Sequence, residues 1–113
     1  HDIQNKMDQL KPFKLPKTLV AFLESDNLYF ELPDSVFISI EFFPLIDTIP
    51  FKVGRRNLLR LSKELGEYND WQIVWDSKSK KIGCYDIEHQ ELRELCKFDE
   101  FMADMSGQLE TLF

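Results

Sequence analysis

Hydrophobic and polar residues alternate most regularly in the last third of the chain. Three runs, at 71–76, 81–87 and 92–97, show this alternation and are separated by short polar segments. A period of two predicts strands that bury one face, and short connections predict that neighbouring strands are antiparallel. We therefore expect a three-stranded antiparallel meander in this region.

A helix is expected directly after the meander. Apolar residues between Phe98 and Met105 recur at positions i, i+3, i+4 and i+7, which is the spacing of one helix face. Asp99 and Glu100 lie in the predicted first turn, where the helix dipole favours negative charge. Gly107 should weaken the helix near its end.

The first two thirds of the chain predict a mixture of helices and strands. Helical spacing of apolar residues is clearest near the N-terminus, while β-branched and aromatic residues dominate the middle of the chain. The predicted elements are helices over 2–10, 16–24 and 55–65, the last with Gly66 as its C-cap, and strands over 28–32, 36–43 and 46–53.

Together these elements predict an α+β fold with a mainly antiparallel sheet and helices at both chain ends packed on it. A length of 113 residues suits a single domain, and a hydrophobic content of 43% argues against intrinsic disorder. We interpret residues 1–113 as one domain. Residues 1–10 are either a peripheral helix or a remnant that precedes the domain proper, because the chain begins with His1 rather than Met.

Acidic side chains concentrate in the second part of the chain. The net charge is −6, and residues 70–113 carry 10 acidic and 5 basic side chains, against 10 and 9 in residues 1–69. Negative charge repels phosphate, which argues against nucleic acid and anionic membranes as partners and favours a basic protein. No apolar stretch approaches a membrane span, and we expect a cytoplasmic location.

The residue types that carry catalysis are sparse. Cys84 and Cys96 form no Cys-x-x-Cys pair, so a zinc site is not expected; they either pair across neighbouring strands or remain two buried thiols. His89 lies in a predicted turn, where it would serve a small Cys/His hydrolase only if a thiol came within reach. We predict an exposed turn histidine, no catalytic residue, no metal site and no cofactor.

The remaining charged groups are interpreted as solvated. They are the carboxylate pairs Glu88/Glu91, Asp99/Glu100 and Asp76/Asp86, and a basic cluster of Arg55, Arg56 and Arg60 beside Lys52 and Lys63. The basic cluster is only a weak indication of a phosphate site.

Several short motifs resemble the SUKH superfamily, the Smi/Knr-like proteins. The matching residues are Leu15-Pro16-x-x-Leu19-x-x-Phe22-Leu23, Ile49-Pro50-Phe51, the run 71–76, the strand that contains Asp86, and Phe98-x-x-Phe101-Met102. The resemblance implies an α+β domain without a catalytic role. Many bacterial members of that superfamily are immunity proteins that neutralise a toxin, and fungal relatives act as regulatory interaction proteins.

We therefore predict a non-enzymatic protein-binding domain, an immunity protein whose partner is a basic toxin domain, with nucleases among the candidate toxins. A regulatory or scaffolding domain of a larger protein is the alternative, and the oligomeric state is left open. Aromatic anchors flanked by carboxylates suit a basic partner. The predicted contact residues are Asp70, Trp71, Asp76, Glu88, Glu91 and Asp99.

Overall fold

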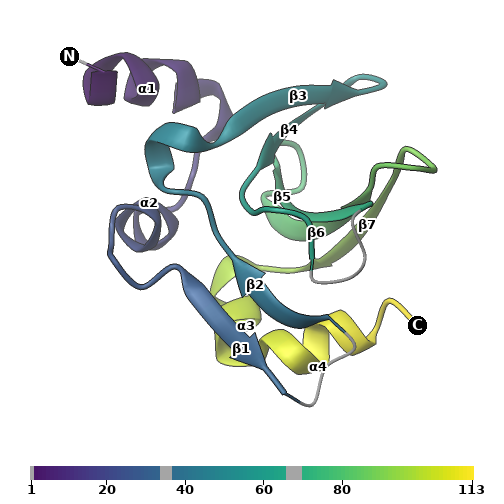
Figure 1. The fold of residues 1–113 in the computed structure, drawn as a ribbon. Helices are drawn as coiled ribbons and strands as arrows, with labels where there is room; N and C mark the ends of the chain where they lie inside the picture. Colours follow the sequence, from purple (N-terminus) through teal and green to yellow (C-terminus); the bar gives the residue numbers. More distant parts are fainter. Residues whose placement is uncertain (1, 34–36, 66–69) are drawn as a thin grey trace.

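A five-stranded antiparallel sheet forms the centre of this computed structural model, which describes residues 2–33, 37–65 and 70–113 (Figure 1). The strands follow one another in sequence order, each beside the next. They are β3 (Ile49–Val53), β4 (Arg56–Arg60), β5 (Trp71–Asp76), β6 (Lys81–Asp86) and β7 (Glu91–Cys96).

A smaller sheet pairs β1 (Tyr29–Leu32) with β2 (Ile38–Glu41) in antiparallel register. The residues that follow β2 lie against the chain that follows β4, through a bridge between Phe42 and Ser62 and a backbone hydrogen bond of 2.8 Å from Phe43 to Leu61. These contacts join the hairpin to the main sheet.

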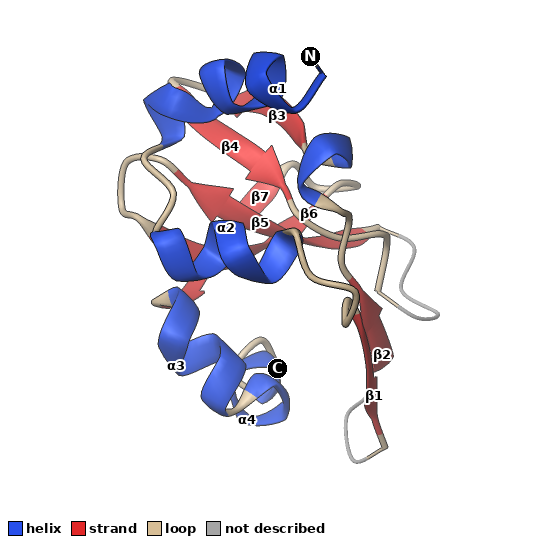
Figure 2. Ribbon diagram, turned by 90° about the vertical axis from the view of Figure 1, so that its left-hand side faces the viewer, coloured by secondary structure: helices blue, strands red, loops and turns tan. Residues whose placement is uncertain are grey.

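The helices lie on one side of the main sheet (Figure 2). They are α1 (Asp2–Leu10), α2 (Lys17–Leu23), α3 (Phe98–Ala103) and α4 (Met105–Glu110), with short 3-10 turns at Lys11–Phe13 and Leu45–Asp47. Their apolar residues pack against inward-facing side chains of the strands and form the main core. Among the described residues, no helix is both long enough and apolar enough to cross a bilayer.

Successive residues of β4 and β5 project to opposite faces of the sheet. Trp75 and its cross-strand partner Leu59 belong to the helix-covered core, whereas Val74 belongs to a second, smaller cluster on the opposite face. That cluster also contains Leu58 and Tyr85, and no helical residue of the described chain takes part in it. The opposite face is therefore the uncovered face of the sheet.

The predicted fold class is confirmed: the chain is α+β, with antiparallel sheets and helices towards both ends. The three-stranded meander occurs as predicted, and the other predicted strands occur with shorter bounds. The predicted C-terminal helix is divided into α3 and α4 at Asp104, whose Oδ1 accepts a hydrogen bond of 3.0 Å from the Gly107 N–H and caps the second helix.

The helix predicted over 55–65 is wrong. Residues 56–60 form β4, which pairs with β3 and β5. Leu58 and Leu59 are both fully buried because they project to opposite faces of a strand that is packed on both sides. The C-cap predicted at Gly66 lies outside the described residues.

Candidate interaction surfaces

Acidic residues from two segments of the chain lie at the end of the sheet that carries the β6–β7 turn. The Ile87 N–H donates a hydrogen bond of 2.5 Å to the Asp70 carbonyl, which places the start of β5 beside this turn. Asp86 is the cross-strand partner of both Trp71 and Glu91. We call the group of Asp70, Asp86, Glu88 and Glu91 the acidic end.

His89 lies at the tip of this turn and is bound to Asp86. The Asp86 carboxylate accepts the His89 backbone N–H at 3.0 Å through Oδ1 and contacts the His89 Nδ1 at 2.8 Å through Oδ2. The side chain of Asp86 is 10% exposed and that of His89 is 63% exposed. The histidine is therefore an exposed turn residue, as predicted, but its link to Asp86 was not anticipated.

The pair shifts the pKa of both groups. Burial alone would raise the pKa of Asp86, but the hydrogen bonds from the backbone and ring of His89 outweigh it and hold that pKa below its ordinary value of 3.8. The hydrogen bond to Asp86, together with the negative charge of Asp86, Glu88 and Glu91, raises the pKa of His89 above 6.5. The imidazolium therefore persists at higher pH than in an isolated histidine.

Replacing Asp86 with Asn should lower the pKa of His89 back towards 6.5, because both its hydrogen-bond acceptor and the nearest charge are changed. An NMR titration of the imidazole carbon-bound protons measures this pKa. Glu88→Gln is the matched control, since it removes one charge without removing the acceptor and should lower the pKa less. Equal decreases in the two variants would contradict the assigned role of Asp86.

These pKa shifts determine how the His89–Asp86 pair contributes to the stability of the fold at different pH values. The contribution of His89 to stability is fully present below pH 6.5 and is lost as the pH rises through the raised pKa of His89 in the folded state. The contribution of Asp86 to stability is present above pH 3.8 and is lost as the pH falls through the lowered pKa of Asp86 in the folded state. The pair therefore stabilises the turn most at pH values between the ordinary pKa of Asp86 and the ordinary pKa of His89.

The predicted contact residues fall into three places. Asp70, Trp71, Glu88 and Glu91 lie together at the acidic end; the two glutamates are exposed, while Asp70 and Trp71 are half-buried. Trp71 contacts the Phe37 ring, with 6.3 Å between ring centroids. The other two predicted residues lie elsewhere.

Asp99 lies in the first turn of α3, beside the β5–β6 turn at the other end of the strands. Asp76 lies on the uncovered face, and its side chain is only 1% exposed. The prediction that Asp76 is a surface contact is therefore wrong: a strand-end aspartate was expected to be solvated, but it is enclosed by an ion pair.

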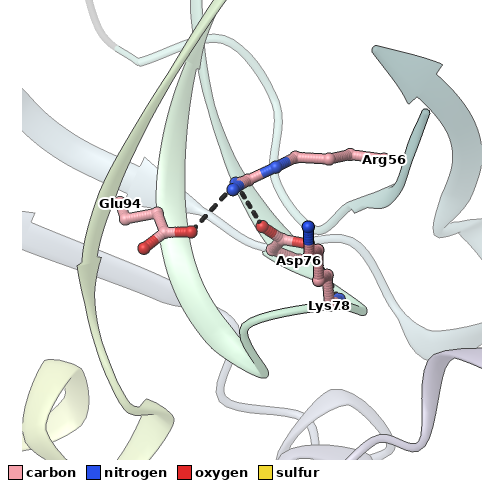
Figure 3. A network of polar contacts seen from close by, with 4 residues as sticks. All are labelled: Arg56, Asp76, Lys78 and Glu94. Atoms are coloured by element: carbon pink, nitrogen blue, oxygen red, sulfur yellow. Dashed lines mark hydrogen bonds and ion pairs between the residues drawn. The ribbon is translucent and has the colours of Figure 1, made fainter. Parts of the chain in front are cut away.

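Asp76 belongs to a network on the uncovered face (Figure 3). The Arg56 Nη1 donates to Asp76 Oδ2 at 2.7 Å and to Glu94 Oε1 at 2.9 Å, while Asp76 Oδ1 accepts the Lys78 backbone N–H at 2.9 Å. Arg56 is on β4 and Glu94 is on β7. In a flat sheet these strands would be roughly 14 Å apart, three spacings of about 4.8 Å, and two side chains that project from the same face would not meet across that distance. The sheet is curved enough for Arg56 to bridge it, as Figure 1 shows.

Gly83 permits this close packing of the uncovered face. It lies on β6 as the cross-strand partner of Glu94 and Val74. A Cβ added here would lie 2.9 Å from the Arg93 carbonyl oxygen, closer than real Cβ atoms approach backbone. The position therefore requires glycine for steric reasons, next to the register shift between Ile82 and Gly83.

Aromatic and polar side chains occupy the rest of the uncovered face. The rings of Phe51 and Tyr85 meet edge to face with 5.0 Å between centroids, and the guanidinium of Arg60 lies 4.5 Å above the centre of the Phe51 ring. The predicted basic cluster is thus dispersed. Arg56 joins the carboxylate network, Arg60 stacks on Phe51, and Lys63 pairs with Glu41 at 2.8 Å.

The two cysteines are buried free thiols, which is one of the two predicted alternatives. Cys84 lies opposite Arg93 and Cys96 lies opposite Ile82, so they are offset along the strands rather than facing each other. Burial raises the pKa of both thiols, with nearby carboxylates adding to the effect. A raised pKa lowers the thiolate fraction and does not favour nucleophilic chemistry.

The residue types that can bind a metal ion are also dispersed over the described structure. Within residues 2–33, 37–65 and 70–113, no three His, Cys, Asp or Glu side chains are grouped so as to hold a metal ion. The carboxylate pair considered from the sequence, Asp76 and Asp86, lies at opposite ends of the paired strands β5 and β6.

No protein-family model, curated protein or solved structure matches this chain. The resemblance to the SUKH superfamily therefore stays a prediction that rests on the motifs quoted above.

Proposed function

We propose that this chain is a non-enzymatic protein-binding domain, an immunity-type protein that binds a basic toxin domain through its acidic end. The observation that carries the proposal is the convergence of Asp70, Asp86, Glu88 and Glu91 at one end of the sheet. The α+β fold is of the kind that the SUKH resemblance implies.

The arrangement suits recognition of arginine and lysine. Glu88 and Glu91 are exposed, and no ion pair of the described residues engages them. Carboxylates grouped on one surface speed the approach of a basic partner and disfavour an acidic one. Trp71, half-buried beside them, offers an apolar contact of the kind that anchors interfaces.

Asp86 and His89 have a supporting role in this proposal. Their mutual hydrogen bonds fix the β6–β7 turn on which Glu88 is carried. A fixed turn lowers the entropy that is lost when its side chains are ordered on binding. Protonated His89 reduces the negative charge of the surface, so affinity for a basic partner should be greater where the imidazole is neutral.

Binding to the protein encoded directly upstream of this chain tests the proposal, because immunity proteins commonly neighbour their toxins. The double variant Glu88→Gln/Glu91→Gln should bind about tenfold more weakly at low salt, the result of two interactions of about 0.7 kcal/mol each. Wild-type affinity should fall as NaCl rises from about 0.05 M to about 0.5 M, because the Debye length shortens from roughly 14 Å to roughly 4 Å. Calorimetric titrations across that range measure both effects.

Glu24→Gln/Asp26→Asn is the matched control. It also removes two exposed carboxylates, but from the turn after α2 rather than from the acidic end. The control should bind like the wild type. Equal weakening in both double variants, or affinity that is indifferent to salt, would overturn the proposed contact surface.

A further inference from the structure

The main sheet has two edges, β3 and β7, which differ in how well they are protected against pairing with another strand (Figure 1). Unpaired backbone groups on a sheet edge can hydrogen-bond to a strand of a second molecule, and natural edges carry features that discourage such pairing. On β3 these features are Pro50, which has no N–H to donate, and the exposed Lys52. β3 is therefore a poor template for a further strand.

β7 lacks the features that protect β3. Its sequence, Glu-Leu-Arg-Glu-Leu-Cys, contains no proline and no lysine. In the part of the chain that the structure describes, only β6 forms backbone hydrogen bonds with β7. Glu91, Arg93 and Glu94 are exposed, and Leu92 is half-buried. A strand of another molecule can therefore reach this edge.

The charged side chains of β7 are arranged so that two copies of the strand attract each other. Glu91 and Arg93 are two residues apart, so they project from the same face of the sheet. Leu92, between them, projects from the uncovered face, where it packs against the cluster that contains Tyr85. Charged residues usually protect an edge, but here opposite charges lie on either side of one apolar residue.

We propose that two copies of this chain pair in antiparallel register through β7, about a two-fold axis that passes beside Leu92. In this register Leu92 lies opposite the same residue of the second copy. Glu91 of each copy lies opposite Arg93 of the other, and such partners have Cβ atoms about 4.5–5.5 Å apart, close enough for two ion pairs. The two five-stranded sheets then become continuous.

The charge pattern favours this register over its neighbours. Two copies related by such an axis present the same face, so only residues that project to the same side can lie opposite each other. An axis at Arg93 would place the two arginines opposite each other, and an axis at Glu94 would do the same with two glutamates. Like charges directly opposite each other destabilise a strand pair. Among these registers, only the one centred on Leu92 places opposite charges together.

The paired segment is short, so the dimer should be weak. The register of β7 is irregular opposite Ile82 and Gly83, which limits the regular segment to the residues around Leu92. The segment buries less than the roughly 800 Å² per partner of a standard interface, and we expect a dissociation constant of about 0.1 mM. At micromolar concentrations the chain is then mainly monomeric, and Glu91 remains available at the acidic end.

Sedimentation velocity at low ionic strength, from about 10 μM to about 1 mM protein, tests the pairing. The wild type should pass from monomer to dimer over this range. Glu91→Arg and Arg93→Glu each place like charges opposite each other at both ion-pair positions, and each should weaken dimerisation at least about tenfold. Lys78→Glu is the matched control: it changes the net charge as Arg93→Glu does, but in the exposed β5–β6 turn, and should dimerise like the wild type.

Mixing the two single variants tests the register. A heterodimer of Glu91→Arg with Arg93→Glu has opposite charges at both positions, so the mixture should dimerise about as well as the wild type although neither variant does so alone. The double variant Glu91→Arg/Arg93→Glu should recover dimerisation for the same reason. Unchanged thermal unfolding of each variant confirms that the fold is intact.

Three results would overturn the proposal. The first is a wild-type chain that stays monomeric at about 1 mM. The second is a mixture that associates no more than its two components. The third is equal weakening by Lys78→Glu and Arg93→Glu, which would show that net charge, and not the pairing of β7, controls association.

Discussion

Replacing Trp75 with Ala should lower the free energy of unfolding by about 4–6 kcal/mol. Removal of a buried Trp typically costs about 3–5 kcal/mol through lost burial and the cavity that remains, and the carbonyl left unpaired adds about 1 kcal/mol. Trp75 is 1% exposed, and its Nε1 donates a hydrogen bond of 3.0 Å to the Phe13 carbonyl oxygen. That bond ties the 3-10 turn after α1 to the centre of the sheet. Urea denaturation followed by tryptophan fluorescence and circular dichroism measures the loss.

Two variants separate the hydrogen bond from the packing. Trp75→Phe keeps most of the aromatic bulk but loses the donor, so it should cost less than Trp75→Ala, about 2 kcal/mol. Tyr29→Ala is a matched aromatic deletion at a side chain that is 52% exposed, and it should cost under about 0.5 kcal/mol. If Trp75→Ala were no more harmful than Tyr29→Ala, the assignment of Trp75 to the centre of the core would be wrong.

The meander was predictable because its runs of strand-forming residues end at clear polar turns, although β5 and β6 are buried on both faces rather than on one. Trp71–Asp76 and Lys81–Asp86 match the predicted runs to within one residue. The polar segments between the runs form the expected turns, each closed by a residue with positive φ, Lys80 at 58° and Gln90 at 55°. Local alternation and turn chemistry agree here, so no tertiary information was needed.

The segment around β4 was mispredicted because local sequence favours helix while the tertiary contacts favour strand. Leu58 and Leu59 are adjacent apolar residues flanked by arginines, a pattern that we interpreted as one apolar face of a helix. In the structure they are buried on opposite sides of a strand that lies between β3 and β5. Pairing on both edges stabilises the extended backbone and outweighs the modest helix propensity of the leucines and arginines.

The candidate surfaces were only partly predictable from the sequence, since charge counts do not reveal which carboxylates are engaged. Glu88 and Glu91 are exposed as expected, because both lie at a hairpin turn. Asp76 is enclosed by Arg56, 20 residues earlier in the chain.

Replacing Arg56 with Met should destabilise the protein by about 2–3 kcal/mol. Removing one partner of a buried ion pair costs about 3–5 kcal/mol when both groups are buried, and we expect less here because the Arg56 side chain is 39% exposed. Met retains the apolar stem, so the loss comes from the Asp76 carboxylate, which would be left 1% exposed without its cation. Thermal and urea unfolding at neutral pH measure the change.

The two carboxylates bound by Arg56 should respond unequally, which distinguishes burial of charge from a simple loss of contacts. Asp76→Asn introduced into the Arg56→Met variant should recover about 1–2 kcal/mol, because a neutral amide needs no cation and still accepts the Lys78 N–H. Glu94→Gln in the wild type should cost under about 1 kcal/mol, since Glu94 is 36% exposed and remains solvated. If Asp76→Asn brings no recovery, the Asp76 charge is not what makes Arg56 necessary. The arginine would then act mainly by holding β4 and β7 together across the uncovered face, and Glu94→Gln would cost as much as Arg56→Met.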